Sequence, residues 1–477
     1  YIDWVLSLPW SVYAQEAISL SHVRETLNHD HYGLEQVKER ILDIIAMRIR
    51  NKQSSPPIIF LVGPPGTGKT SLARSIAASL NRPFERISVG GVDDESTIRG
   101  HRRTYIGAIP GRFISAVKKA QVANPVILID EIDKMGSRNS DAARAALLEI
   151  LDHEQNSSFL DHYLGVPFDF SQVLFITTAN TIQEIPEALV DRMEIIQLSS
   201  YTVEEKVVIV RSYLWPRALA KVNIDPADLS IDDDVIRLII TQYTFEPGIR
   251  ELDRLMTTVC MKAARALLDE LVISQITQAV MVEYLGPLHT GHDIVQKTDA
   301  IGVVNGLSKN AAGGSAFPVQ VSLMPGKGEL QLTGKLGEMI QESAKIAISY
   351  VRAHARELNI PDNLFQEMDI HIHMPASATP KDGPSAGVAM TTALISACTK
   401  RKAKCCFAMT GEIDLQGHVL PIGGLKEKVL AAARHGITHI IAPRANQVDF
   451  ELFKDLVTDM EFIWAENIDQ IIDHVLI

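Results

Sequence analysis

The run Gly63–Thr70 (GPPGTGKT) constrains the fold of this chain more than any other feature. It fits the pattern G-x-x-x-x-G-K-[ST] and lies between an apolar stretch, Ile58–Val62, and a helical pattern, Lys69–Leu80. Glycines in such a turn let backbone N–H groups wrap a phosphate at a helix N-terminus, where the helix dipole favours anions. The motif therefore predicts a phosphate-binding strand–turn–helix unit, in which Lys69 reaches the outer phosphates and Thr70 ligates Mg²⁺.

Short apolar stretches and helical patterns continue to alternate up to residue 198. This βαβ alternation predicts a parallel sheet with helices on both faces. The segment 202–286 then reads as helices, and after Pro287 strands return around a long helix. The expected strands are Glu85–Val89, Val126–Ile129, Val173–Thr177 and Glu194–Leu198, and the expected helices are Phe113–Gln121, Ala142–Leu151, Glu204–Val222, Ile249–Leu268 and Gly337–Leu358.

A second motif, Val126–Asp133 (VILIDEID), places two adjacent carboxylates after a buried strand. Asp130 is expected to hold the Mg²⁺ shell and Glu131 to polarise the attacking water, a division of labour that hydrolysis needs. Carboxylates at a strand end can also be merely solvated. The phosphate-binding run upstream favours the functional interpretation.

Composition narrows the classes of protein without choosing a chemistry. The 477 residues suggest about three domains, and 46 Lys+Arg against 58 Asp+Glu give a formal net charge of −12, which argues against non-specific duplex DNA binding as the main activity. Four cysteines are too few for a disulfide scaffold, so a reducing compartment is expected. We find no apolar run of about 18 residues that would span a membrane. Because the chain begins with Tyr1, it is expected to be a processed piece of a longer protein.

A further chemical motif, Thr379–Gly387 (TPKDGPSAG), precedes a helical run. Ser385 would sit at a sharp turn with its Oγ exposed near amide N–H groups that could stabilise an oxyanion, although a serine there is also a good N-cap. A serine nucleophile can use a lysine as its base if that lysine is neutral. The stretch Pro421–Gly436 offers Lys426 and Lys428, and helical spacing does not choose between them.

Two histidines, His371 and His373, share one face of a predicted strand. They could bind a metal, but no Cys or acidic partner follows at a suitable spacing. A packing or supporting role is therefore the favoured interpretation.

Together, the phosphate-binding run, the acidic strand, the polar strand end Thr177–Asn180 (TTAN) and the run Gly248–Arg254 (GIRELDR) resemble an AAA+ ATPase. The resemblance implies that Asn180 orients the attacking water, that Arg250 contacts the γ-phosphate from a helical lid, and that Arg192 reaches the nucleotide of a neighbouring subunit. It implies ATP and Mg²⁺ as cofactors. The residues expected to bind ATP are Gly63, Pro64, Pro65, Gly66, Thr67, Gly68, Lys69, Thr70, Asp130, Asn180, Arg192 and Arg250.

The segment Gly100–Arg112 (GHRRTYIGAIPGR) holds an apolar pair between glycines. From its chemistry alone, a loop tucked onto the core is the favoured interpretation. Resemblance to AAA+ unfoldases reverses this and implies that Tyr105 and Ile106 form a pore loop that grips an unfolded chain.

The C-terminal motifs PKDGPSAG and TGEIDLQGHVLPIGGLKEK resemble the proteolytic domain of Lon, the ATP-dependent serine protease with a Ser-Lys dyad. The resemblance implies that Ser385 is the nucleophile, Lys428 the base and Lys426 a structural or solvated lysine. It also implies supporting positions near the dyad, with a hydrogen bond between Thr410 and the lysine amine. The supporting residues are Asp382, Thr410 and Glu412.

The resemblance covers nearly the whole chain and implies four parts: a helical remnant of an N-terminal region (1–50), an AAA+ α/β ATPase subdomain (51–200), a helical lid (201–286) and an α+β Lon-type proteolytic domain (287–477). Three departures are visible. Met135–Glu149 lacks the aromatic residue and the Gly-Asp-Pro of a second substrate-facing loop, and Leu307–Pro318 differs from the usual start of the proteolytic domain. From the resemblance, only the last helical portion of the large N-terminal substrate-recognition domain is expected in this chain.

The implied function is an ATP-dependent serine endopeptidase of protein quality control and the stress response, which unfolds, translocates and degrades misfolded, damaged or regulatory proteins. The resemblance implies a homohexamer in the bacterial cytoplasm, with the mitochondrial matrix as the alternative and no membrane partner. Two rival hypotheses are a non-proteolytic AAA+ remodelling chaperone and a nucleic-acid translocase. The net charge of −12 weighs against the translocase, while secondary DNA binding stays open.

Overall fold

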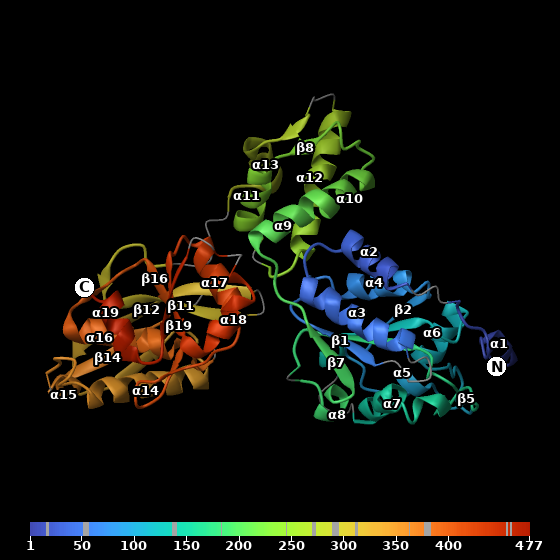
Figure 1. The fold of residues 1–477 in the computed structure, drawn as a ribbon, viewed down its shortest axis with the longest axis horizontal. Coiled ribbons are helices and arrows are strands. Elements are labelled where there is room, and N and C mark those ends of the chain that lie inside the picture. Colours follow the sequence, from blue (N-terminus) through green and yellow to red (C-terminus); the bar gives the residue numbers. More distant parts are fainter. Residues whose placement is uncertain are drawn as a thin grey trace. The chain divides into compact units, whose positions relative to one another are not determined.

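The computed structural model describes residues 1–15, 19–50, 57–135, 141–182, 184–244, 246–269, 273–288, 295–310, 313–361, 363–375, 383–454, 457 and 460–477. The chain forms two compact units (Figure 1). The first comprises Tyr1–Asn223 with Pro247–Cys260, and the second comprises Ile224–Glu246 with Met261–Ile477. None of the helices within these ranges is long and apolar enough to cross a membrane.

A five-stranded sheet with parallel neighbours forms the centre of the first unit, as the βαβ pattern predicts. Its strand order is β2-β3-β6-β1-β7. Every residue of β1, β3 and β6 is buried, which explains why β1 and the first residues of β3 and β6 read as continuous apolar runs. The strands are β1 (Ile58–Val62), β2 (Phe84–Ser88), β3 (Val126–Asp130), β6 (Leu174–Ala179) and β7 (Met193–Gln197).

Helices cover both faces of this sheet. On one face, Ile59 and Leu61 of β1 pack with α2 (Leu20–Asp30), α3 (Glu35–Arg50) and α4 (Lys69–Ser79). The alternate residues of β1 pack on the other face with α6 (Arg112–Ala120) and α7 (Asp141–Leu151). Shorter elements complete the unit: α1 (Ile2–Ser7), α5 (Ser96–Arg99), α8 (Glu187–Val190), β4 (Phe159–Leu160) and β5 (Pro167–Phe168).

The helix predicted over Glu204–Val222 is interrupted. It consists of α9 (Val203–Ile209), a π-helical segment (Val210–Leu214) and α10 (Trp215–Lys221). Pro216 stands in the first turn of α10, and its missing N–H removes a helical hydrogen bond, which explains the local change of hydrogen-bond pattern. The helix α12 (Arg250–Leu268) follows the prediction closely.

In the second unit, α11 (Asp233–Tyr243) and α13 (Gln278–Leu285) accompany a parallel pair of two-residue strands, β8 (Ser230–Ile231) and β9 (Gln275–Ile276). The prediction of helices alone for 202–286 is wrong at these two strands. They are too short to produce an alternating pattern.

A seven-stranded mixed sheet forms the rest of this unit, in the order β13-β14-β12-β11-β16-β19-β20. The neighbours β11, β12 and β14 are antiparallel, whereas β11, β16, β19 and β20 are parallel. The strands are β11 (Val303–Asn310), β12 (Gly313–Pro325), β13 (Leu330–Thr333), β14 (Met368–His373), β16 (Phe407–Met409), β19 (His439–Pro443) and β20 (Glu461–Ala465). Two small pairs lie beside it: β10 (Ala300–Ile301) with β15 (Lys402–Ala403), and β17 (Glu412–Ile413) with β18 (Val419–Leu420).

Each face of the mixed sheet has its own apolar cluster. One cluster contains α14 (Glu338–Ala353), the almost wholly buried α16 (Gly387–Thr399) and α19 (Ile468–Val475). The other contains α17 (Leu425–Arg434), near which α18 (Gln447–Glu451) packs. A short helix, α15 (Leu364–Glu367), precedes β14. The observed α14 ends before Leu358, the predicted end, because the chain leaves helical geometry at His354.

Candidate functional site

The predicted phosphate-binding run connects β1 to α4. Gly66 and Gly68 adopt φ of 80° and 91°, left-handed values that glycine takes at no steric cost. Thr67 stabilises the turn from within, because its Oγ1 donates to the carbonyl of Pro64 at 2.9 Å. Tyr201 holds the turn from outside by donating its hydroxyl to the carbonyl of Thr67 at 3.0 Å.

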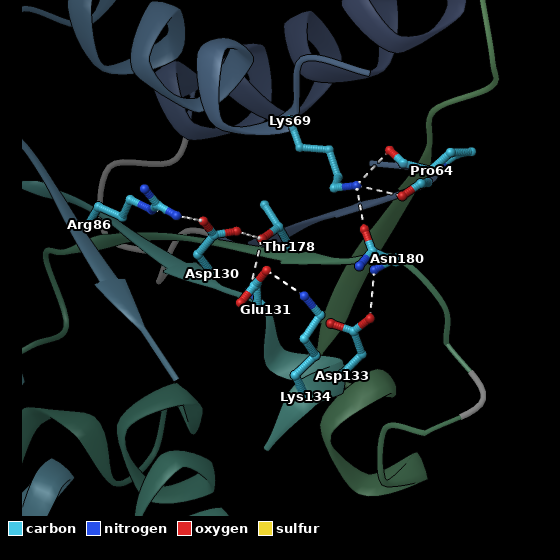
Figure 2. Close-up of polar contacts among 10 residues, drawn as sticks. Pro64, Lys69, Arg86, Asp130, Glu131, Asp133, Lys134, Thr178 and Asn180 are labelled. Atoms are coloured by element: carbon cyan, nitrogen blue, oxygen red, sulfur yellow. Dashed lines mark hydrogen bonds and ion pairs between the residues drawn. The ribbon is translucent and has the colours of Figure 1, made fainter. Parts of the chain in front are cut away.

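Lys69 points back into this turn (Figure 2). Its ammonium donates to the carbonyls of Gly63 and Pro64 and, at 3.1 Å, to Oδ1 of Asn180. Burial lowers the pKa of Lys69 to about 8, while Asp133 and Asp130 oppose the change. The structure thus brings the predicted phosphate ligand and the predicted water-orienting amide into direct contact.

Asp133 fixes the position of Asn180, because its Oδ2 accepts the Asn180 backbone N–H at 2.9 Å. No role for Asp133 is predicted from the sequence. Its place in the run DEID, three residues after Asp130, is the only signal that could have drawn attention to it.

Asp130 ends β3, and its carboxylate is buried between two donors (Figure 2). Thr178 donates its hydroxyl to Oδ1, and Arg86 on β2 donates to Oδ2 through Nε at 2.8 Å. Arg86 was also missed, because only the pairing of β2 with β3 brings it to this carboxylate. Hard oxygen donors are what Mg²⁺ prefers, so Asp130 and the Thr70 hydroxyl, which lines the same cavity, fit that ion.

Glu131 diverges from Asp130 because its backbone is left-handed, with φ of 62°. That conformation is costly for a residue with a side chain and often marks a functional position. The Glu131 backbone N–H donates to the Thr178 hydroxyl at 3.2 Å, and its carboxylate accepts from Lys134 Nζ at 2.6 Å.

These groups line a cavity of about 290 Å³. Arg217, Arg250 and Asp253 line it from the helical side, and Arg217 pairs with Asp253 at 2.7 Å. Two glycines meet at the rim: a Cβ built on Gly248 would lie 2.3 Å from the carbonyl carbon of Gly66. The Ile249 N–H donates to the Gly66 carbonyl at 3.0 Å. This contact places Arg250 at the cavity, as the resemblance implies.

Arg192 does not line this cavity. Its guanidinium donates to the Ala188 carbonyl at 2.6 Å and to Asp152 at 3.2 Å, and its side chain is 39% exposed. Any action of Arg192 on a nucleotide must therefore be on one bound elsewhere.

The predicted pore loop projects two apolar side chains into solvent: Tyr105 is 66% exposed and Ile106 is fully exposed. Buried Asp161 secures the base of the loop by accepting the Gly111 N–H at 2.7 Å. The segment Met135–Glu149, where the resemblance implies a second loop, is described only at Met135 and from Asp141 onward, so residues 136–140 lie outside the described residues.

Ser385 lies in a 3₁₀ turn, Pro384–Ala386, directly before α16. It does not cap that helix, because Ala386 occupies the N-cap position and no side chain makes a cap hydrogen bond. The Ser385 carbonyl accepts the Gly411 N–H at 2.9 Å and the Thr410 hydroxyl at 3.3 Å. The turn that carries Ser385 is therefore hydrogen-bonded to Thr410 and Gly411, the two residues that directly follow β16.

Lys428 lies on α17 with 2% exposure, and its ammonium donates to Thr410 Oγ1 at 3.1 Å. Lys426 remains partly exposed, so burial separates the two lysines that helical spacing left equivalent. Within the described residues, no hydrogen bond joins Ser385 Oγ to Lys428 Nζ, and Thr410 is their shared contact. Glu412 begins β17 two residues beyond Thr410, and Asp382 lies outside the described residues.

Burial also lowers the pKa of Lys428, to about 8, and the positive charge of Lys309 acts in the same direction. The carboxylate of Glu427 acts against it. A neutral amine is thus accessible to Lys428 near physiological pH, as a general base requires.

The histidine pair His371 and His373 has a structural partner. Both rings hydrogen-bond to the Thr333 hydroxyl, at 2.9 and 2.7 Å. In the part of the chain that the structure describes, no group of three or more metal-ligating side chains is present.

Three family descriptions match successive segments of the chain. Residues 59–201 match the ATPase family associated with various cellular activities, residues 220–275 match the Lon protease AAA+ ATPase lid domain, and residues 275–477 match the Lon protease (S16) C-terminal proteolytic domain. These matches agree with the resemblance seen in the sequence.

Curated relatives are similar over the whole chain. A Lon protease of Bacillus thuringiensis (strain Al Hakam) is 49% identical, one of Dictyoglomus thermophilum 47%, and Lon protease 1 of Bacillus subtilis (strain 168) 48%, each over 100% of this chain. The chain spans 60, 61 and 62% of the length of these relatives, respectively. The chain therefore contains the AAA, lid and C-terminal proteolytic domains of the Lon protease family.

Proposed function

We propose that this chain is the motor and protease portion of an ATP-dependent serine endopeptidase that unfolds and degrades proteins. The observation that carries the proposal is the buried Thr410, which contacts both Ser385 and Lys428. A nucleotide cavity in the same chain supplies the second half of the activity. The domain bounds 1–50, 51–200, 201–286 and 287–477 belong to this proposal.

In the nucleotide cavity, Lys69 exchanges the carbonyls of Gly63 and Pro64 for the outer phosphate oxygens of ATP. Asp130 and Thr70 would hold Mg²⁺, which would offset the negative charge of the phosphates when bound. Asn180 orients the attacking water, and Glu131 polarises it once its carboxylate leaves Lys134. Arg250 contacts the γ-phosphate from the lid.

In the proteolytic site, neutral Lys428 takes the proton of Ser385 Oγ, and the oxygen attacks the peptide carbonyl. As the C–N bond breaks, Lys428 returns the proton to the leaving amine, which leaves an acyl-enzyme on Ser385. Water then attacks the ester while Lys428 accepts its proton, and as the bond between the acyl carbon and Ser385 Oγ breaks, Lys428 returns that proton to Oγ and the carboxyl product leaves. Thr410 keeps the amine directed toward the turn that carries Ser385, and Asp382 and Glu412 support the site.

The proposed assembly is a homohexamer. The exposed position of Arg192, outside its own cavity, supports a role at a neighbouring subunit's nucleotide, and the exposed Tyr105 and Ile106 support a grip on unfolded chains. We propose the bacterial cytoplasm as the location, because the matched relatives named above are bacterial. Protein quality control and the stress response are the corresponding roles, and secondary DNA binding is left to direct measurement.

The test is ATP-dependent degradation of an unfolded model protein by three variants. Ser385→Ala is expected to lower peptide-bond hydrolysis by about 10³-fold or more while ATP turnover continues, because only the nucleophile is lost. Glu131→Gln is expected to lower ATP turnover by about 10²-fold. Ser349→Ala, a change at an exposed serine on α14, is the matched control and should leave both activities in place.

Two outcomes would contradict the assignments. Unchanged hydrolysis by Ser385→Ala would remove the dyad and favour a remodelling chaperone. ATP turnover that responds to single-stranded DNA but not to unfolded protein would favour a nucleic-acid translocase.

A further inference from the structure

The end of the β11–β12 hairpin packs tightly on the first turn of α17, the helix that carries Lys428. Lys309 and Gly314 are cross-strand partners in this hairpin. A Cβ built on Gly314 would lie 1.8 Å from the carbonyl oxygen of Glu427, so no side chain fits there. The Gly314 carbonyl accepts from Arg434, farther along α17, at 2.7 Å. The hairpin is therefore fixed against the helix at two points.

Lys309 extends from this hairpin across the start of α17. A Cβ built on Gly424, at the N-cap of the helix, would lie 2.4 Å from Lys309 Cδ, so the lysine stem occupies that space. The ammonium lies 3.3 Å from Glu427 Oε1. The Glu427 side chain is 9% exposed and the Lys309 side chain 49%, so the carboxylate of the pair is shielded from solvent while the ammonium side chain is about half exposed.

We propose that Lys309 is a positioning residue for the proteolytic base: by pairing with Glu427, it offsets the carboxylate adjacent to Lys428 and favours the neutral amine. The ion pair between Lys309 and Glu427, and its effect on the charge of Lys428, do not depend on the proposed function. Only its effect on peptide hydrolysis rests on the proposed function.

The surroundings of Lys428 leave these two groups as its main charged neighbours among the described residues. Burial is the largest influence on its pKa, followed by Lys309, with Glu427 opposing. The facing residues 314–317 of β12 carry no ionisable side chain. The remaining charged groups are Glu412 on β17, Lys426 and Arg434 on α17 itself, and Asp449 and Glu451 on α18, which bond to Asn446 and Lys454, respectively.

Removing the cation and removing the carboxylate should shift the pKa of Lys428 in opposite directions. Lys309→Met keeps a stem over Gly424 but leaves the Glu427 carboxylate without this cation, which favours protonated Lys428 and raises its pKa. Glu427→Gln removes the carboxylate while Lys309 stays, which disfavours protonated Lys428 and lowers its pKa. A role for Lys309 in packing alone predicts neither the shifts nor their opposite signs.

The decisive measurement is an NMR titration of the chain labelled with ¹³C at lysine Cε. The Lys428 signal is assigned from its absence in Lys428→Met. Lys309→Met should raise the Lys428 pKa by roughly half a unit to one unit, and Glu427→Gln should lower it by a similar amount. Lys309→Arg should leave it in place. Lys454→Met, which breaks an exposed pair with Glu451, is the matched control and should also leave it in place.

Peptide hydrolysis gives a second readout. The acid limb of its pH profile should shift to higher pH for Lys309→Met and to lower pH for Glu427→Gln. The rate of hydrolysis at pH 7 by Lys309→Met should fall by about three- to tenfold. Thermal unfolding checks that each variant folds, and Lys309→Gln serves as a second neutral variant.

A Lys428 pKa that stays in place in both variants, or moves the same way in both, overturns the proposal. Opposite shifts without any Ser385-dependent hydrolysis support the charge control of Lys428 and contradict the proposed function instead. The two failures are therefore distinguishable.

Discussion

Two lysines, the partly buried Lys69 and the buried Lys428, each have a pKa lowered to about 8 by burial, but the charged neighbour that acts most strongly on each is of opposite sign. Around Lys69, the carboxylates of Asp133 and Asp130 favour the charged amine, and a cavity of about 290 Å³ lies open before it. Around Lys428, the cation Lys309 disfavours the charged amine more than Glu427 favours it, and the ammonium donates a hydrogen bond to the Thr410 hydroxyl. Burial thus lowers the pKa of both lysines to a similar value. The sign of the strongest neighbouring charge differs: the carboxylates favour charged Lys69, as binding an anion requires, whereas Lys309 favours neutral Lys428, as accepting a proton requires.

Exchanging each lysine for methionine gives the largest expected effect and separates the two sites. Lys69→Met should weaken nucleotide binding by about 100-fold or more, because its charge-assisted bonds to phosphate are lost. Lys428→Met should lower peptide hydrolysis by about 10³-fold and leave nucleotide affinity intact. Fluorescent-nucleotide titration and peptide hydrolysis measure the two losses.

Lys426→Met is the control for Lys428→Met, since Lys426 is two residues away on the same helix and partly exposed. Loss of hydrolysis in Lys426→Met but not in Lys428→Met would reverse the assignment of the base. Loss of nucleotide affinity in Lys428→Met would show that the contrast between the sites is wrong.

A smaller effect is expected on stability. The pKa of Lys428 falls from 10.5 to about 8 on folding, so between pH 8 and 10.5 the unfolded chain binds more protons than the folded one. Stability of the parent chain should rise with pH across this window, and the full penalty should be present below pH 8. Lys428→Met removes the penalty and should be more stable at pH 7 by on the order of 1–3 kcal/mol.

Denaturant unfolding of the parent chain and Lys428→Met at pH 7 and pH 10 measures this difference, which should shrink at the higher pH. A difference that grows with pH would mean that the folded chain accommodates the charged amine. Lys426→Met again serves as the matched variant.

The smallest effect concerns Glu131. Its ion pair with Lys134 joins side chains that are 40% and 51% exposed, and exposed pairs contribute less than about 1 kcal/mol. Lys134→Met should therefore change ATP turnover by at most about fivefold, upward, because Glu131 is released for water. A tenfold fall, measured as phosphate release, would instead assign Lys134 a direct part in hydrolysis.

The strand–turn–helix around Lys69 and the acidic end of β3 could be predicted because each motif is contiguous and periodic. Arg86 and Asp133 could not, since their contacts depend on strand pairing and on side-chain direction rather than on spacing. The choice between Lys426 and Lys428 likewise depends on what packs against α17. Helical periodicity does not show which lysine the neighbouring elements bury, so from the sequence only the family resemblance favoured Lys428.

Local geometry limited the prediction of elements as well. The π-helical segment Val210–Leu214 follows from Pro216, a signal that was present in the sequence but is compatible with an unbroken helix start. The two-residue strands β8 and β9 are too short for any pattern. Thr410 joins the proteolytic site from 25 residues beyond Ser385, a distance that chemistry-based spacing rules do not cover.

The contact between Gly66 and Gly248 has a mechanical consequence. Nothing but backbone separates the phosphate-binding turn from the segment that leads into Arg250, and one N–H···O bond joins them. A rotation of the peptide plane at Gly66 would therefore act directly on the Ile249 N–H, with no flexible side chain in between. That carbonyl is thus a single point through which a change in the turn would reach the residue next to Arg250.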